Sequence, residues 1–211
     1  WLEGGLPHHE ALILACFSRA EEHRWRSITE QEVGQGELAL FCSPGEPELP
    51  MPWPVENEDL RRAYMDLQLA DRRRADPLGY PALAVADVEE DIYRHLLNEI
   101  ARWRLGQVSR DRNSAAGLGD AVRHAWQQRA RETSLDHASQ CLVDIVRRAG
   151  RVTEEIEVAI LRRDWLSFIA LTSAAHERPY TDMALFWLSA TVQEREDCLT
   201  SVGNAQGGKA A

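Results

Sequence analysis

Apolar residues recur three and four positions apart along most of the chain, with charged residues between them. This spacing predicts amphipathic helices over residues 10–26, 56–70, 84–105, 119–132, 134–149 and 181–199, with others starting near Thr153 and Asp164. No pair of alternating runs offers the partners that a sheet requires. The pattern therefore predicts an all-α fold, a single-domain bundle of about seven to nine helices.

Two of these helices have unusual apolar faces. Helix 84–105 is the strongest prediction, because six of its residues fall on one side: Val85, Val88, Ile92, Leu96, Ile100 and Trp103. We expect this face to lie in the core. The first half of helix 181–199 is apolar on both sides, which predicts a place at the centre of the core or against a partner.

One long segment interrupts the helical pattern. An apolar run ends at Cys42, and prolines follow at positions 44, 47, 50, 52 and 54, which excludes both a helix and an interior strand. We expect segment 43–55 to cross the bundle, with Leu40, Phe41 and Trp53 buried against the last helix. Residues 1–202 then form one domain, with a loop or insertion at 106–119 and a disordered tail at 203–211.

Charge and composition narrow the function. The 211 residues carry a formal charge of −10, which disfavours binding to nucleic acid and favours protein or cationic partners. No apolar run approaches the ~20 residues of a membrane-spanning helix. The four cysteines are widely separated, which predicts reduced thiols in a cytoplasmic protein. The arginine run 72–74 is interpreted as a solvated helix end.

Candidate catalytic or metal-binding groups are few. Asp and His occur four residues apart at Asp91 and His95 and again at Asp120 and His124, a spacing that surface ion pairs explain. His95 and Glu99 have a ligand spacing found in iron-binding bundles, but the chain has no Glu-x-x-His motif. The sequence therefore predicts no catalytic residues, no metal and no cofactor.

Two stretches resemble a known family. Residues 40–45 (Leu-Phe-Cys-Ser-Pro-Gly) and 50–53 (Pro-Met-Pro-Trp) are similar to a turn and proline-rich segment of the TorD/DmsD/NarJ-type molybdoenzyme maturation chaperones. Residues 165–168 (Trp-Leu-Ser-Phe) and 179–185 resemble the start of that family's last helices. The family's Glu-Pro-x-Asp-His hinge is incomplete here, because Asp87 is present without the His.

The resemblance implies a non-catalytic cytoplasmic chaperone. Its partner would be an apo-redox-enzyme subunit, or the signal peptide of that subunit, bound before cofactor loading and export. An arginine pair in such a peptide needs carboxylates beside an apolar groove. The expected partner-binding residues are Trp53, Asp87, Glu90, Asp91, Tyr93 and His95.

Two other hypotheses stay open. In the first hypothesis, the protein is a helical adaptor or assembly protein. Its last helix is then an oligomer interface, in a homodimer or with another chain. Alternatively, it is a helical enzyme with a site near His95 and Glu99, to which Asp91 and Tyr93 contribute.

Overall fold

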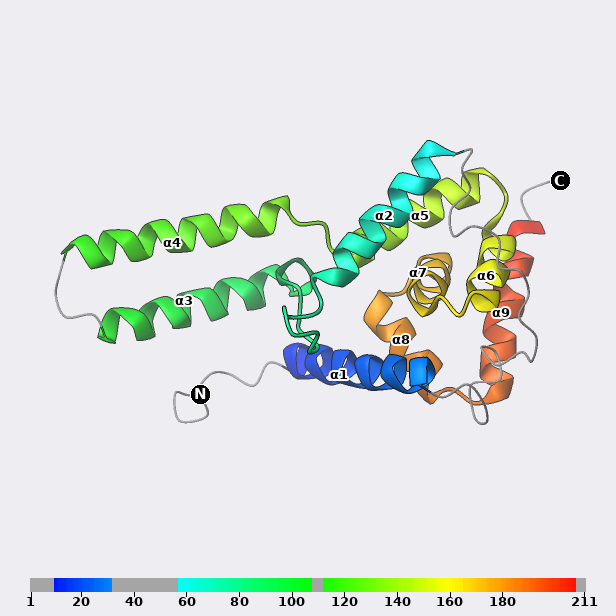
Figure 1. The fold of residues 1–211 in the computed structure, drawn as a ribbon, viewed down its shortest axis with the longest axis horizontal. Helices are drawn as coiled ribbons and strands as arrows, with labels where there is room; N and C mark the ends of the chain where they lie inside the picture. Colours follow the sequence, from blue (N-terminus) through cyan, green and yellow to red (C-terminus); the bar gives the residue numbers. More distant parts are fainter. Residues whose placement is uncertain (1–9, 32–56, 108–111, 208–211) are drawn as a thin grey trace.

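The computed structural model describes residues 10–31, 57–107 and 112–207 (Figure 1). Its helices are α1 (Glu10–Gln31), α2 (Glu58–Arg72), the 3-10 turn η3 (Val85–Asp87), α3 (Glu90–Gln107), α4 (Arg112–Arg131), α5 (Leu135–Arg148), α6 (Val152–Leu161), α7 (Trp165–Ala175), α8 (Tyr180–Ser189) and α9 (Val192–Gly207). Within these ranges there is no β-strand, only an isolated bridge between Ala75 and Pro81. The predicted all-α class is confirmed. None of the helices in this part of the chain is both long and apolar enough to cross a membrane.

Helix α7 is the centre of the core. It is apolar on all sides, and its buried residues include Phe168, Ile169 and Leu171, each 0% exposed. Helices α2, α5, α6, α8 and α9 all contact it. We call these helices, with α7, the body of the molecule (Figure 1).

Helices α2 and α5 lie side by side over α7. Each begins at a side-chain cap, where Asn57 accepts a hydrogen bond from the Leu60 amide (3.1 Å) and Ser134 accepts one from the His137 amide (3.2 Å). Asp164 caps α7 in the same way, at 3.1 Å from the Ser167 amide. The sequence predicted the Ser134 and Asp164 starts correctly.

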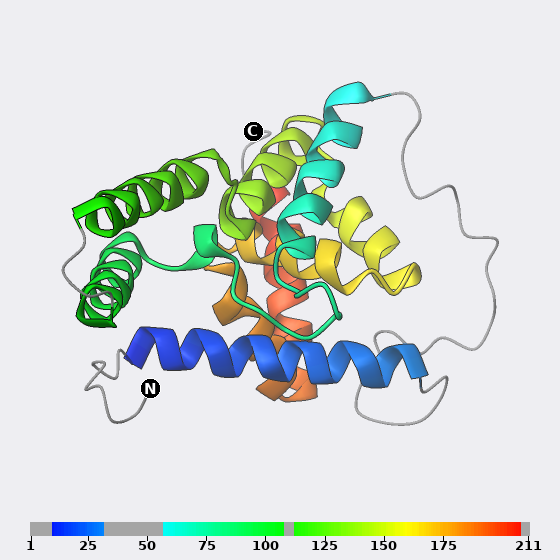
Figure 2. The ribbon, with the colours of Figure 1, turned by 60° about the vertical axis from the view of Figure 1, so that its left-hand side comes forward.

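Helices α3 and α4 form an antiparallel hairpin that projects away from the body (Figures 1 and 2). We call this hairpin the arm. The predicted helix 84–105 instead begins at Glu90, after the separate turn η3. Of the six face residues expected in the core, only Ile92 is buried, and Trp103 is 63% exposed. The prediction failed because a projecting hairpin gives each helix a neighbour on one side only.

Two other boundaries differ from the prediction. Residues 112–119, expected in a loop, belong to α4, and α9 continues to Gly207 into the expected disordered tail. The predicted helix 181–199 is divided at Ala190, whose backbone is extended. There, Thr191 and Glu194 form a capping box, in which the Glu194 carboxylate accepts from the Thr191 amide at 2.7 Å. The proline-rich segment 43–55, with Leu40, Phe41 and Trp53, lies outside the described residues.

A buried ionic cluster fastens α1 to the body. The Glu22 carboxylate is fully buried and lies 2.7 Å from an Arg26 nitrogen, 2.8 Å from an Arg74 nitrogen and 3.0 Å from the Tyr180 hydroxyl. Arg19 donates two hydrogen bonds to the Arg74 carbonyl, at 2.8 and 3.0 Å. Arg74 is 3% exposed, so only the first two arginines of the 72–74 run are solvated as predicted.

Candidate functional site

The base of the arm is tied to the body through Asp87. This carboxylate accepts a hydrogen bond of 2.7 Å from the Leu135 amide at the start of α5, and it lies 3.6 Å from Nε of Arg74. Burial raises the pKa of the Asp87 carboxyl group, against the opposing effect of that hydrogen bond and of Arg74. Arg129 of α4 donates to the Val88 carbonyl at 2.6 Å, which joins α4 to the segment that leads into α3.

Tyr93 and Trp126 hold the two helices of the arm together. Their rings meet edge to face with centroids 5.3 Å apart, and the Tyr93 hydroxyl donates to the Ala125 carbonyl at 3.4 Å. The Arg129 guanidinium lies over the Tyr93 ring at 5.5 Å, and that of Arg94 over the Trp126 ring at 5.8 Å. These contacts join α3 to α4 in the half of the arm nearest the body.

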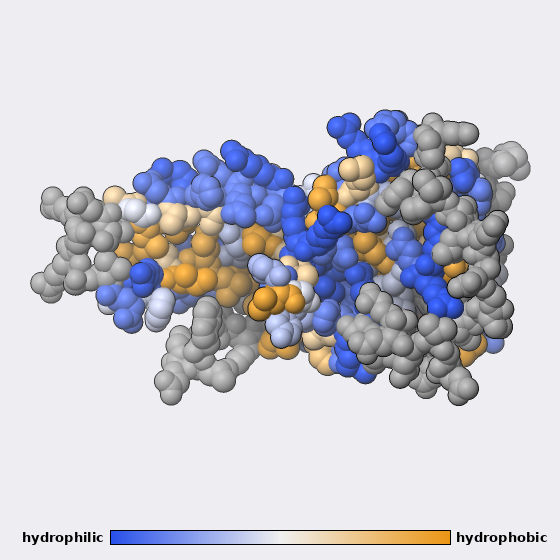
Figure 3. All heavy atoms as spheres, viewed as in Figure 1, coloured by the Kyte–Doolittle hydropathy of each residue, from blue (hydrophilic) through white to orange (hydrophobic). Residues whose placement is uncertain are grey.

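The outer half of the arm exposes large apolar side chains. Ile100 is 43% exposed, Trp103 63% and Leu105 48%. Leu96, Ile100 and Trp103 recur at i, i+4 and i+7, so they form one stripe on α3, which we call the arm stripe. Figure 3 shows hydrophobic residues along the arm, bordered by hydrophilic ones. An apolar face of this kind on a helical hairpin is a surface that another chain can cover.

Charged residues flank the arm stripe. Beside the stripe, Arg102 pairs with Glu99. Nearer the body, Arg94 pairs with Glu90 at 2.6 Å and Asp91 at 3.0 Å, but Arg94 and Asp91 project from the opposite side of α3. Arg104 is exposed and makes no ion pair within the described residues. The stripe is therefore bounded by charges that a bound molecule can reach.

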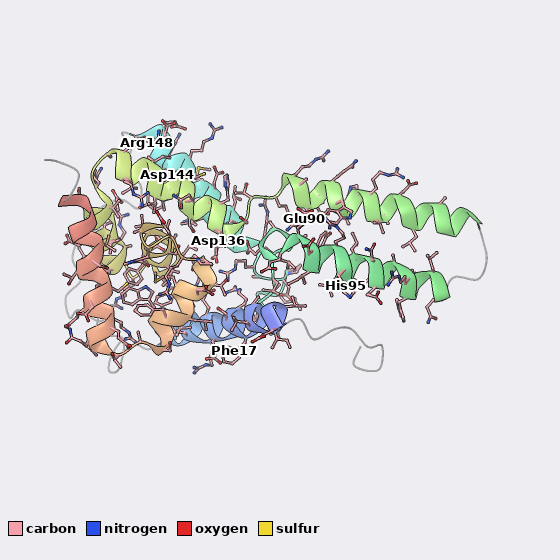
Figure 4. All side chains as sticks on the ribbon, turned by 180° about the vertical axis from the view of Figure 1, so that it is seen from behind. Phe17, Glu90, His95, Asp136, Asp144 and Arg148 are labelled. Atoms are coloured by element: carbon pink, nitrogen blue, oxygen red, sulfur yellow. The ribbon has the colours of Figure 1, made fainter. Side chains whose placement is uncertain are left out.

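Two other segments expose apolar side chains. Phe17, on the N-terminal half of α1, is 57% exposed, as are Ile13 and Leu14 to a similar degree. Leu78 is 81% exposed at the tip of a turn in which the Asp76 carboxylate accepts from the Leu78 and Tyr80 amides. Figure 4 shows Phe17 on α1 and His95 on the side of α3 away from α4.

The residues predicted to bind a partner lie mostly at the base of the arm. Asp87 caps α5, Tyr93 packs against α4, and the exposed Glu90 and Asp91 pair with Arg94. His95 is half-buried on α3. Trp53 lies outside the described residues. Five of the six predicted residues are close together because they are close in the sequence, and the structure gives Asp87 and Tyr93 structural contacts.

The exposed stripe was missed because its residues were assigned to the core. Ile100 and Trp103 belong to the face of helix 84–105 that the sequence predicted to be buried. The residues beside Trp103 gave no signal, because a buried helical residue can also lie between two charges, as Leu60 does between Asp59 and Arg61.

Catalytic groups are weakly represented in the described part of the chain. No three His, Cys, Asp or Glu residues there lie close enough together to hold a metal ion, including around His95 and Glu99. Sγ of Cys198 lies 3.2 Å from Nε2 of His176, but burial raises the pKa of the thiol and lowers the pKa of the imidazole. Both shifts favour the neutral thiol and the neutral imidazole, whereas an activated cysteine is a thiolate. Asp144, Arg147 and Arg148 line a shallow depression on α5.

No family model matches the chain, and neither the curated proteins nor the solved structures contain a match. The resemblance to molybdoenzyme maturation chaperones stays a prediction.

Proposed function

We propose that this protein is a non-catalytic binding protein that holds an amphipathic helical segment of a partner protein along its arm. The observation that supports this most directly is the exposure of Ile100 and Trp103 on one face of a hairpin that projects from the body. A third helix against the arm stripe would convert the hairpin into a three-helix unit with a covered face.

The energy of such docking is sufficient for specific binding. Complete burial of an exposed Leu, Ile or Phe side chain stabilises by about 1.5–3 kcal/mol, so the half-exposed apolar residues of the arm provide several kcal/mol. Trp103 is the natural anchor, because Trp is enriched among residues that dominate binding energy. The entropy lost on association reduces the net gain in binding free energy. We therefore expect a Kd in the micromolar rather than the picomolar range.

The narrower form of this proposal is a cytoplasmic chaperone for an apo-redox-enzyme subunit. Binding to a twin-arginine signal peptide would need free carboxylates near the groove. Glu90 and Asp91 would then exchange Arg94 for the peptide, and Asp87 would give up the amide of Leu135. The broader proposal needs none of these exchanges.

The test is amide hydrogen exchange with and without an uncharged amphipathic peptide of about 18 residues, with Leu on one face and Gln on the other. We expect new protection in α3 and α4 and none in α7. The double variant Ile100→Glu, Trp103→Glu should lose this protection while its helix content and melting temperature stay unchanged.

The matched control is Met65→Glu, Leu69→Glu. These residues are 53% and 47% exposed on α2, so they form a second apolar pair outside the arm. Protection that persists in the arm variant, or disappears equally in the α2 variant, would remove the arm from the proposal. Absence of any peptide-dependent protection would contradict the proposed function.

A further inference from the structure

The charge of the chain is divided unequally between the arm and the rest. Helices α3 and α4 contain seven arginines and four Asp or Glu residues, a formal charge of +3. The whole chain carries −10, so the remainder carries −13. The only described hairpin that projects from the body is therefore positively charged on an otherwise acidic protein.

This positive charge borders the arm stripe directly. Successive residues on a helix are separated by about 100°, so Arg102 and Arg104 project to opposite sides of Trp103. Both side chains are exposed. Arg102 forms an ion pair with Glu99, whereas Arg104 has no ion pair among the described residues. An apolar stripe with guanidinium groups on both sides is complementary to an apolar stripe with carboxylates on both sides.

We infer that the arm binds an acidic amphipathic helix, with apolar residues at i, i+3 or i+4, and i+7 and with Asp or Glu on both flanks. This inference rests on the proposed function and specifies the chemistry of the partner. The 18 residues of α3 extend over about 27 Å, which sets the useful length of the partner helix at about five turns. Its carboxylates would pair with Arg104 and compete with Glu99 for Arg102.

A second copy of the chain fits the arm less well. In a symmetric pair of arms the same patches meet, so two surfaces of charge +3 would face each other. The alternative pairing of an arm with the acidic body of another copy joins different surfaces and does not close into a dimer.

An anionic membrane also fits less well. The stripe runs back from Trp103 to Leu96, about 10 Å along the side of the arm towards the body. A flat surface that reached Leu96 would also approach the body, which carries most of the charge of −13. A single helix can lie along the arm and avoid that repulsion.

The experiment compares three peptides with the same length and the same Leu face, whose flanking positions are Glu, Gln or Arg. Fluorescence anisotropy gives Kd at low and high salt with the full chain. We expect the Glu peptide to bind about tenfold more tightly than the Gln peptide, and the Arg peptide to bind most weakly. The preference should decrease as salt increases, because the flanking charges are exposed.

Two double variants separate charge from the apolar face. Arg102→Gln, Arg104→Gln should remove the preference for Glu and leave the Kd of the Gln peptide unchanged. Arg61→Gln, Arg62→Gln, at exposed positions of α2, is the matched control and should keep the preference.

The outcomes distinguish this inference from the proposed function. Equal binding of the Glu and Gln peptides, lost in Ile100→Glu, Trp103→Glu, would overturn the acidic partner but retain the proposed function. If the Arg peptide bound more tightly than the Glu peptide, the acidic partner would be overturned in favour of a cationic segment such as a twin-arginine signal. Failure of all three peptides contradicts both claims. Sedimentation that then showed self-association, or cosedimentation with phosphatidylserine vesicles, would assign the stripe to a second copy or to a membrane.

Discussion

Helices α5 and α3 are both amphipathic, but only α5 has its apolar face covered. Leu142, Val143 and Val146 of α5 are at most 1% exposed, because α2 and α7 pack against them. Helix α3 is paired mainly with α4, and Trp103 at its outer end stays 63% exposed. Apolar periodicity therefore shows which face of a helix requires a neighbour. It does not show whether that neighbour belongs to the same chain.

The sharpest test of this contrast compares large-to-small substitutions in the two regions. Phe168→Ala, in the centre of the body, should reduce the free energy of unfolding by about 3–5 kcal/mol, because it leaves a cavity in a fully buried site. Trp103→Ala removes a larger side chain from the arm and should change stability by less than about 0.5 kcal/mol. Urea unfolding with an unchanged m-value measures both. A loss of several kcal/mol for Trp103→Ala would mean that the stripe is covered within the chain.

The second test concerns charge burial, which differs between the ionic cluster and the exposed side of α1. Glu22→Gln leaves Arg74, 3% exposed, and Arg26 without their buried carboxylate, and should reduce stability by about 3 kcal/mol. The control is Glu21→Gln on the same helix, whose exposed pair with Arg24 is worth at most about 0.5 kcal/mol. Equal effects of the two variants, measured by thermal unfolding, would show that α1 is not fastened by the ionic cluster.

The helices and several of their starts could be predicted, because the signals that set them are local. The cap of α5 at Ser134 lies within three residues of the amide that it satisfies, and the 3.6-residue period is visible within one element. The division of the last helix had a local signal as well. That signal is the Thr191-x-x-Glu194 capping box. The prediction followed the apolar run before Thr191 instead and continued one helix across it.

The ionic cluster and the arm stripe could not be predicted in this way. Glu22, Arg74 and Tyr180 are far apart in the sequence, and each is individually typical of a solvated or core-edge position. The exposure of Trp103 depends on the direction in which the hairpin leaves the body. At its base, Asp87 contacts Leu135, and Arg129 contacts Val88, both across more than 40 positions of the sequence. Such long-range contacts leave no periodic pattern in the sequence.

The smallest predicted effect is a pH dependence that arises from His176, at the end of α7. Burial lowers the pKa of His176 below its ordinary value of 6.5, against its contact with Cys198 and with help from the nearby charge of Arg178. Well above pH 6.5 the imidazole is neutral in both the folded and the unfolded chain. As the pH falls below 6.5, the unfolded chain takes up the proton first, so this group reduces stability progressively until the folded form is protonated as well. His176→Gln should therefore make unfolding less sensitive to acid as the pH falls through 6.5. An identical slope in the His176 variant would show that the imidazole is no better solvated in the unfolded chain than in its site between α7 and α9.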